Sequence, residues 1–144
     1  MYFDGERAMR FSSKEQYGLR AMVELAQRHG EGPVPLSEVA AAQGIPLPYL
    51  EQIAALLRRA GLLESTRGAY GGYRLSRQPA AITVGDVIRA LEGPLVPVKC
   101  IVGGDEVCEL VNRCATRSVW ELVRQRLEET LDGITLADLS ARLK

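Results

Sequence analysis

Residues 37–77 read SEVAAAQGIPLPYLEQIAALLRRAGLLESTRGAYGGYRLSR and contain two short helix patterns followed by a hairpin pattern. Ser37 is expected to cap the first helix, and Gly44 with Ile45-Pro46 ends it because proline cannot extend a helical turn. Pro48 suits the first turn of the second helix. Two helices joined by a glycine-containing turn are typical of a helix-turn-helix, although generic helical hairpins share the pattern.

Two β-compatible runs, 62–66 and 73–76, follow the second helix pattern. The residues between them, 67–72, include three glycines, which permit tight turns and close backbone approach. A hairpin with arginine and glycine at its tip, directly after two such helices, predicts the wing of a winged helix. Its tip suits contact with the minor groove and phosphates of DNA. An ordinary hairpin without such a role is the alternative interpretation.

Further helix patterns flank this unit. Ser12 with Glu15 and Ser13 with Gln16 each fit a capping box, and Gly30 supplies the stop of the helix that follows. Thr83 is expected to cap a helix closed by Gly93-Pro94. The residues of the first flanking helix expected to point inward are Leu19, Met22, Val23 and Ala26. A last short helix is expected to be capped by Thr135 with Asp138.

Ser118 with Glu121 predicts a capping box that opens a long helix to Leu131. The apolar residues of this helix cover more than one narrow face, so the helix needs two neighbours. In a short chain the second neighbour can be a twin subunit. The expected fold class is therefore mainly α, with a winged helix-turn-helix, a small β-hairpin wing and a long C-terminal dimerisation helix.

Composition and charge set further limits. The chain has 144 residues, 47% apolar and 25% charged, which is ordinary for a soluble globular protein. It has no apolar run of membrane-spanning length and no secretory signal, so a cytoplasmic location is expected. Phosphate-cradling and nucleophile-elbow motifs are absent, and an enzyme is not expected. Residues 56–77 hold five arginines and one acid, a local balance of 5 − 1 = +4, which indicates either a nucleic-acid reader or a solvated basic face.

Cys100, Cys108 and Cys114 lie within 15 residues of one another. An odd count in a chain expected to be cytoplasmic argues against disulfides, and the lack of a Cys-x-x-Cys knuckle argues against the usual structural zinc site. Three thiolates in a loop that contains Gly103-Gly104 instead suit an iron–sulfur cluster with one coordination position left open. Three reduced loop thiols are the alternative interpretation.

Several motifs occur in a characteristic order between about residues 9 and 143. They are Met9-Arg10-Phe11-Ser12-Ser13-Lys14, Tyr17-Gly18-Leu19-Arg20-Ala21-Met22, Gly44-Ile45-Pro46, Tyr49-Leu50-Glu51-Gln52, Arg67-Gly68, Gly71-Gly72-Tyr73, the cysteine triplet, and Ile134-Thr135-Leu136-Ala137-Asp138-Leu139. In these motifs the chain resembles the IscR-like iron–sulfur cluster regulators, in the family of small bacterial winged-helix repressors that also includes NsrR and CymR.

The resemblance implies a homodimer that binds double-stranded operator DNA, with no membrane partner and no small-molecule substrate. It implies a DNA-binding domain over residues 9–93, a cysteine-containing cluster-binding loop over 94–117, and a dimerisation helix with a C-terminal helix over 118–144. The helix that starts at Ser118 would pair with its twin.

By the same resemblance, Tyr49, Glu51 and Gln52 belong to the recognition helix and would face the major groove. The Gln52 amide can pair with adenine, whereas Glu51 can accept from cytosine or repel a phosphate. Arg67 would enter the minor groove. A serine often stands at the place of Pro48 in IscR relatives, so one hydroxyl contact would be lost here. The expected DNA-binding residues are Lys14, Pro48, Tyr49, Glu51, Gln52, Arg58, Arg59, Arg67, Gly68, Tyr70 and Gly71.

The resemblance also implies that Cys100, Cys108 and Cys114 bind an iron–sulfur cluster, usually a 2Fe–2S centre in IscR. Arg117 stands where the best-known IscR has a histidine ligand, and a guanidinium is always protonated and cannot ligate iron. The first cysteine spacing is seven residues, whereas the best-known members have five. The fourth ligand stays unidentified, with Glu15, Gln16, His29, Asp105, Glu106 and Glu109 as candidates.

The expected function is a transcriptional repressor that senses cluster status and controls iron–sulfur cluster biogenesis genes. Cluster ligation would act by shifting the population between forms that prefer different sites. A nitric-oxide or redox-sensing regulator of the same family is one alternative. A zinc-stabilised protein-interaction module is another, from a different class, whereas an electron-transfer carrier is disfavoured by the helix-turn-helix and wing.

Overall fold

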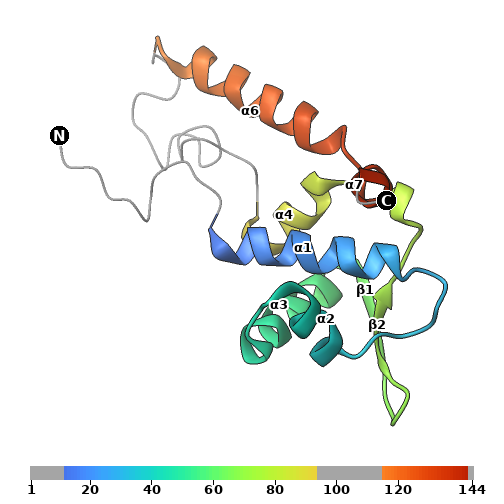
Figure 1. The fold of residues 1–144 in the computed structure, drawn as a ribbon. Helices are drawn as coiled ribbons and strands as arrows, with labels where there is room; N and C mark the ends of the chain where they lie inside the picture. The colour runs from blue at the N-terminus through green and yellow to red at the C-terminus, as the bar shows by residue number, and fades with distance from the viewer. Residues whose placement is uncertain (1–11, 94–114, 143–144) are drawn as a thin grey trace.

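The computed structural model describes residues 12–93 and 115–142 (Figure 1). The cysteine triplet and most of the predicted cluster-binding loop therefore lie outside the described residues. The described elements are α1 (Ser13–Gln27), α2 (Leu36–Gln43), α3 (Leu47–Arg59), β1 (Leu63–Thr66), β2 (Gly72–Leu75), the 3-10 helix η1 (Pro79–Ala81), α4 (Val84–Glu92), α6 (Arg117–Asp132) and α7 (Leu136–Arg142).

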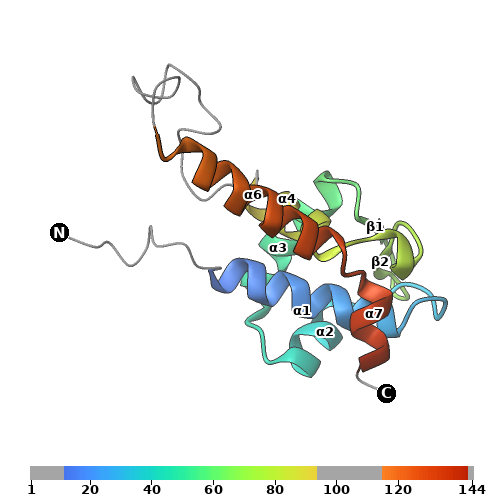
Figure 2. The same ribbon diagram turned by 90° about the horizontal axis from the view of Figure 1, so that it is seen from above.

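Helices α1 and α4 form the middle of the molecule (Figure 1). In Figure 1 the α2–α3 pair and the β1–β2 hairpin lie on one side of them, and α6 extends along the opposite side. Seen from above, α6 lies over α4 (Figure 2). The predicted mainly helical winged helix-turn-helix with a small hairpin is confirmed. No helix within 12–93 and 115–142 is long and apolar enough to cross a membrane.

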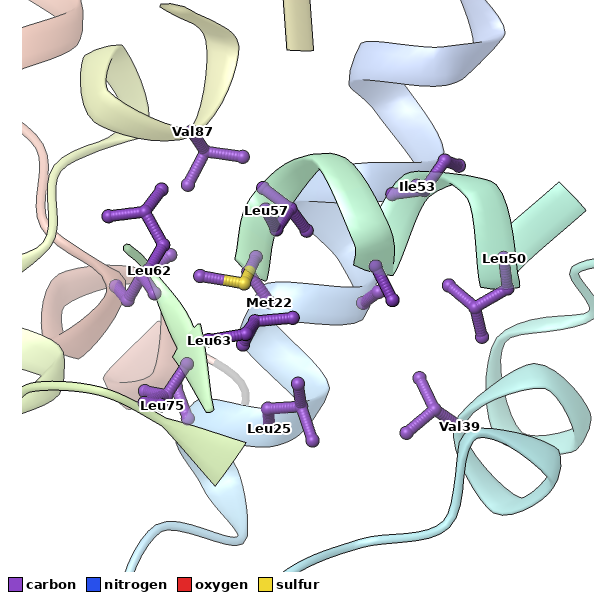
Figure 3. Packing of buried hydrophobic residues seen from close by; sticks show 14 of the residues in the cluster. Met22, Leu25, Val39, Leu50, Ile53, Leu57, Leu62, Leu63, Leu75 and Val87 are labelled. Carbon is purple, nitrogen blue, oxygen red and sulfur yellow. The ribbon is translucent and has the colours of Figure 1, made fainter. Parts of the chain in front are cut away.

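The core lies between α1, α3 and the hairpin (Figure 3). Met22 of α1 is fully buried and points toward Leu57 of α3 and Leu63 of β1 (Figure 3). Each fully buried side chain of this size contributes roughly 1.5–3 kcal/mol relative to its exposed state, so a few such residues account for much of the stability. The largest fully buried side chains are Met22, Leu50, Ile53, Leu57, Ile82, Leu136, Val39 and Val87.

The inward face of α1 differs from the predicted stripe. Met22 and Ala26 are buried as expected, but Leu19 and Val23 are only half-buried. The buried face instead includes Gly18, Ala21 and Leu25. A Cβ on Gly18 would overlap the Leu91 side chain of α4, so the lack of a side chain allows α1 and α4 to pack closely. A count of large apolar residues misses such a face.

Two of the predicted helix starts form as expected. The Asp86 backbone N–H donates to the Thr83 hydroxyl at 3.0 Å, and the Thr83 N–H donates to the Asp86 carboxylate at 3.0 Å. The same exchange joins Thr135 and Asp138, at 2.9 and 3.1 Å. The hydrogen bond from the Thr135 N–H has the largest effect on the pKa of Asp138, which it lowers, and the hydrogen bond with the Thr135 hydroxyl lowers it further. Both boxes bring together groups three residues apart, so sequence alone identifies them.

The other predicted caps do not form as expected. Ser12 stands at the N-cap position of α1, but its hydroxyl donates to the Glu15 side chain and makes no capping bond to the backbone, and Ser13 is already the first residue of the helix. Helix α2 begins at Leu36 after Pro35, which places Ser37 inside its first turn. Helix α6 begins at Arg117, so Ser118 also lies inside the helix, and Glu121 accepts from Arg117 at 2.9 Å. In the last two cases the helix starts upstream of the serine, and a hydroxyl within the first turn no longer occupies the capping position.

Candidate nucleic-acid interface

The turn between α2 and α3 sets the position of the predicted recognition helix. Gly44 ends α2 in the left-handed region, at φ 65° and ψ 37°, which glycine adopts without steric cost. Ile45 is buried next to it, and its N–H donates to the Ala40 carbonyl at 3.0 Å. Pro46 then precedes α3 in an extended conformation. The connection between α2 and α3 is thus three residues long, and the buried Ile45 anchors it on the core.

Helix α3 has one buried face and one exposed face. Leu50, Ile53, Ala54 and Leu57 recur at helical spacing and are buried. The predicted reading residues lie on the other face, where Pro48, Glu51, Gln52, Arg58 and Arg59 are all exposed. The structure therefore brings these five residues together on one surface, which we call the reading face. Their contact with DNA stays a prediction.

Tyr49 lies at the edge of this face and is held by α1. Its ring meets the Tyr17 ring edge-on, with centroids 5.7 Å apart, and its hydroxyl lies 3.3 Å from the Ser13 hydroxyl. Arg20 stacks its guanidinium 5.4 Å from the Tyr17 ring centroid. Sequence reasoning missed this role of Tyr17, because no local signal links residues on different helices.

The wing, residues 63–75, is an antiparallel hairpin in which Leu63 pairs with Leu75 and Thr66 with Gly72. At its tip the Gly71 N–H donates to the Gly68 carbonyl at 3.0 Å. Tyr70 is 95% exposed there, and Arg67 is exposed beside it. A tyrosine so fully exposed buries nothing within the chain and is free to contact a partner.

Contacts with the Val34 backbone and with α3 tie the wing to the rest of the molecule. Val34 forms a bridge with Tyr73, through N–H to carbonyl bonds of 2.9 and 2.8 Å. Gly72 lies against the Val34 backbone so closely that a Cβ would overlap it. Arg58 of α3 donates to the Ser65 hydroxyl of β1 at 3.1 Å. The reading face and the wing are therefore held together as one surface.

The cations of this surface differ in their partners. Arg74 pairs with Glu64 at 3.2 Å across the hairpin. In the part of the chain that the structure describes, Arg58, Arg59 and Arg67 have no carboxylate within ion-pair distance. Unpaired guanidinium groups are the groups that neutralise phosphates, because they give up no internal ion pair on binding.

Lys14, also predicted to bind DNA, lies in the first turn of α1, on a different helix from the reading face. Its ammonium pairs with Glu92, the last residue of α4, at 2.9 Å. This pair offsets its charge, and a contact between Lys14 and DNA stays a prediction. The pair also shows that the start of α1 lies beside the end of α4, where the segment with the cysteines begins.

The candidate fourth ligands are spread along α1. Glu15 is buried and accepts from Ser12, and Gln16 is exposed one residue further on. His29 follows the other end of the helix and lines a cavity of about 380 Å³ with Tyr73 of the wing. Asp105, Glu106 and Glu109 lie outside the described residues, as do all three cysteines. Within the described residues, no group of three or more His, Cys, Asp or Glu side chains could hold a metal ion.

Comparison with known proteins agrees with this architecture. The family model of Rrf2, described as an iron-dependent transcriptional regulator, matches residues 11–142. The HTH-type transcriptional regulator CymR of Bacillus subtilis is 45% identical over 92% of this chain and 91% of its own length. The HTH-type transcriptional regulator IscR of Aliivibrio salmonicida is 44% identical over 91% of this chain and 77% of its own length.

Solved structures show the same likeness. The structure of CymR, the global cysteine regulator of B. subtilis, superposes with a TM-score of 0.77 at 44% identity, covering 93% of this chain and 98% of that one. T. potens IscR gives 0.76 at 46% identity, covering 97% and 92%. These relatives are regulators, so the expectation of a non-enzymatic protein is confirmed. The chain belongs to the Rrf2 family of transcriptional regulators, in the group that includes CymR and IscR.

Proposed function

We propose that this regulator binds double-stranded operator DNA as a homodimer and represses transcription from it. The observation that carries the proposal is the single surface on which the exposed face of α3 and the tip of the wing lie together, with the unpaired Arg58, Arg59 and Arg67. An exposed helix of this kind fits the major groove, while the wing reaches the adjacent backbone or minor groove.

Helix α6 supports the homodimer. None of its 16 residues is buried, and Val119 and Leu122 in its first half are 52% and 50% exposed. Within residues 12–93 and 115–142, the second half of α6 packs on the protomer, where Leu127 and Leu131 contact Val84 and Ile88 of α4. An apolar helical face left in water is unfavourable, and the same face of a second copy can cover it.

The DNA contact is tested by selecting tight-binding duplexes from a random pool and measuring binding by fluorescence anisotropy. We expect Gln52→Ala to lose discrimination at one base pair, because a bidentate amide–adenine pair contributes about 1–3 kcal/mol. Gln27→Ala is the matched control, since Gln27 is exposed on α1 away from the reading face. No selected sequence, or equal loss in both variants, would contradict the proposal.

The sensing part of the proposal rests on Cys100, Cys108 and Cys114, which would hold an iron–sulfur cluster of the 2Fe–2S type. Cysteine thiolates are the usual donors for such a cluster, normally four, so three leave one position to another ligand, and Arg117 cannot fill it. When bound, the cluster supplies a redox-active centre whose occupancy can change with cluster supply. The Lys14–Glu92 pair brings the first turn of α1, which carries Glu15 and Gln16, to the end of α4, the last described element before residue 94. His29 follows the other end of α1, so we propose Glu15 or Gln16 as the fourth ligand.

Anaerobic purification followed by an absorption spectrum and an iron and sulfide count tests this part separately. Visible bands with equal iron and sulfide, lost in Cys108→Ala, are the expected result. One zinc per chain without iron would instead indicate the zinc-stabilised module. No metal after anaerobic reconstitution would leave a regulator with plain thiols.

A nitric-oxide or redox-sensing regulator is the second candidate. The chain is as similar to CymR, named a cysteine regulator, as to IscR, so family similarity alone favours neither signal. Loss of DNA binding on nitrosylation of the reconstituted protein would favour the second candidate. Control of iron–sulfur biogenesis genes is favoured if DNA affinity changes with cluster occupancy and is indifferent to nitric oxide.

A further inference from the structure

Helices α4 and α6 meet at a joint that is held by backbone hydrogen bonds, by apolar contacts and by an ion pair. The Val84 N–H donates to the Ile134 carbonyl at 2.8 Å, and the Leu136 N–H donates to the Ile82 carbonyl at 2.9 Å. Apolar contacts add Leu127 and Leu131 against Val84 and Ile88. Among the residues that the structure describes, these contacts involve the second half of α6 and the residues just after it, so this end of α6 is the one fixed to α4.

The ion pair of the joint is formed by Asp132, the last residue of α6, and Arg89 of α4. Both oxygens of its carboxylate accept from Arg89 of α4, at 2.9 and 2.6 Å, and one of them also accepts from the Thr83 hydroxyl at 3.4 Å. Gly85 lies beneath the carboxylate, where a Cβ would overlap Asp132. A two-pronged pair fixes direction as well as distance, because both guanidinium N–H groups must meet both oxygens in one plane.

The length of α6 makes this direction important. Sixteen residues at the helical rise of 1.5 Å span about 24 Å, so a rotation of about 10° at the joint moves the far end by about 4 Å. One base pair adds about 3.4 Å along the duplex and about 34° of twist. A change of about 10° in the angle between α4 and α6 therefore changes the distance between the two reading faces of a dimer by about one base pair.

We propose that Arg89, Asp132 and Thr83 form a clamp that determines which half-site spacing the dimer accepts. These residues touch no DNA base. They act as positioning residues, because they hold α4, and with it the reading face and the wing, at a fixed angle to α6. The proposal rests on the proposed function, because spacing has meaning only for a dimer on DNA.

The test measures affinity for the selected duplex and for the same duplex with one base pair inserted between half-sites. The spacing ratio is the first affinity divided by the second. We expect Asp132→Ala to lower this ratio about two- to fivefold, the range expected for losing a partly exposed ion pair, with the dimer intact by light scattering. Glu129→Ala is the matched control, because Glu129 is on the same helix and pairs with Arg126 within α6. An unchanged ratio in dimeric Asp132→Ala would overturn the clamp.

Charge-reversal variants distinguish the loss of the ion pair from a general loss of folding. Arg89→Asp and Asp132→Arg each place like charges face to face, whereas the double variant restores opposite charges. We expect both single variants to lower the spacing ratio and the double variant to recover it. A double variant that folds and dimerises without recovery counts against the clamp.

Hydrogen exchange separates this proposal from the proposed function. In Asp132→Ala the amides of residues 127–136 should exchange several-fold faster, with α3 unchanged, whether or not DNA binds. Unchanged exchange at these amides would overturn the clamp. A wild-type chain that is monomeric or selects no duplex would instead refute the proposed function, and exchange alone would then decide whether the clamp holds α6.

Discussion

The ring of Tyr17 meets the ring of Tyr49 edge-on, at an interplanar angle of 83°, and so joins the middle of the molecule to the predicted recognition helix. The pair connects α1 to the first turn of α3, at the edge of the reading face. Tyr49 is therefore held in place by a residue that does not itself lie on that face.

Replacing Tyr17 tests this support. We expect Tyr17→Leu to lower the free energy of unfolding by about 1 kcal/mol, since an aromatic pair contributes about 0.5–1.5 kcal/mol beyond its buried area. DNA affinity should fall while its salt dependence stays the same, because no phosphate contact is removed. Tyr17→Phe keeps the ring and is the control. Equal DNA affinity for the Leu and Phe variants would show that Tyr17 does not position Tyr49 for binding.

The wing arginines should differ in their effect on salt dependence. Arg67→Ala should weaken binding of all duplexes and reduce the slope of log affinity against log salt by about one, as expected for one lost phosphate contact. Arg74→Ala should change the slope less, because Arg74 already pairs with Glu64. Anisotropy titrations over a range of salt concentrations measure both slopes. Equal slopes for Arg67→Ala and the wild type would place Arg67 away from the phosphates.

The exposed half of α6 predicts how the dimer can be broken. Leu122 is 50% exposed in the protomer, so Leu122→Glu should leave the fold intact and place a charge in the dimer interface. We expect a monomer by light scattering, with an unchanged helical circular dichroism spectrum and much weaker DNA binding. Gln125→Glu adds the same charge on the same helix and should stay dimeric. A dimeric Leu122→Glu chain would move the interface elsewhere.

Acid should weaken the joint between α4 and α6. The hydrogen bonds from Arg89 lower the pKa of Asp132 and, in turn, raise the pKa of Arg89, despite the opposing effect of partial burial on each. A carboxyl whose pKa is lower in the folded state contributes stability above its unfolded value of about 3.9, and this stability is lost as the pH falls through the folded pKa. Asp86 and Glu128 also act on Arg89, so the pair is part of a small charge cluster.

Urea unfolding of the wild type and Asp132→Asn measures this contribution. Since both side chains are more than a third exposed, we expect a difference of less than about 1 kcal/mol at pH 7. The difference should shrink below about pH 4, as Asp132 becomes protonated. Both proteins should share the acid loss that arises from Asp138, whose pKa is also lowered. A difference that stays constant down to pH 2 would show that the carboxylate charge is not the source.

Sequence alone determined the features whose physics is local. The capping boxes at Thr83 and Thr135 each join groups three residues apart, and Gly44 meets a backbone requirement of its own turn. The order of helices, the hairpin and the apolar face of α3 follow from spacing along one element. The predicted reading residues were found in the same way, or by resemblance of short motifs.

Only the tertiary structure decided which elements meet. Tyr17 and Tyr49 are 32 residues apart and Arg89 and Asp132 are 43 apart, so each pair forms only after the core has positioned its two helices. Gly18 and Gly85 define close contacts by having no side chain, which leaves no signal in a hydrophobic pattern. The angle of α6 depends on such long-range contacts, because a helix's own sequence fixes its faces and leaves its direction to its neighbours.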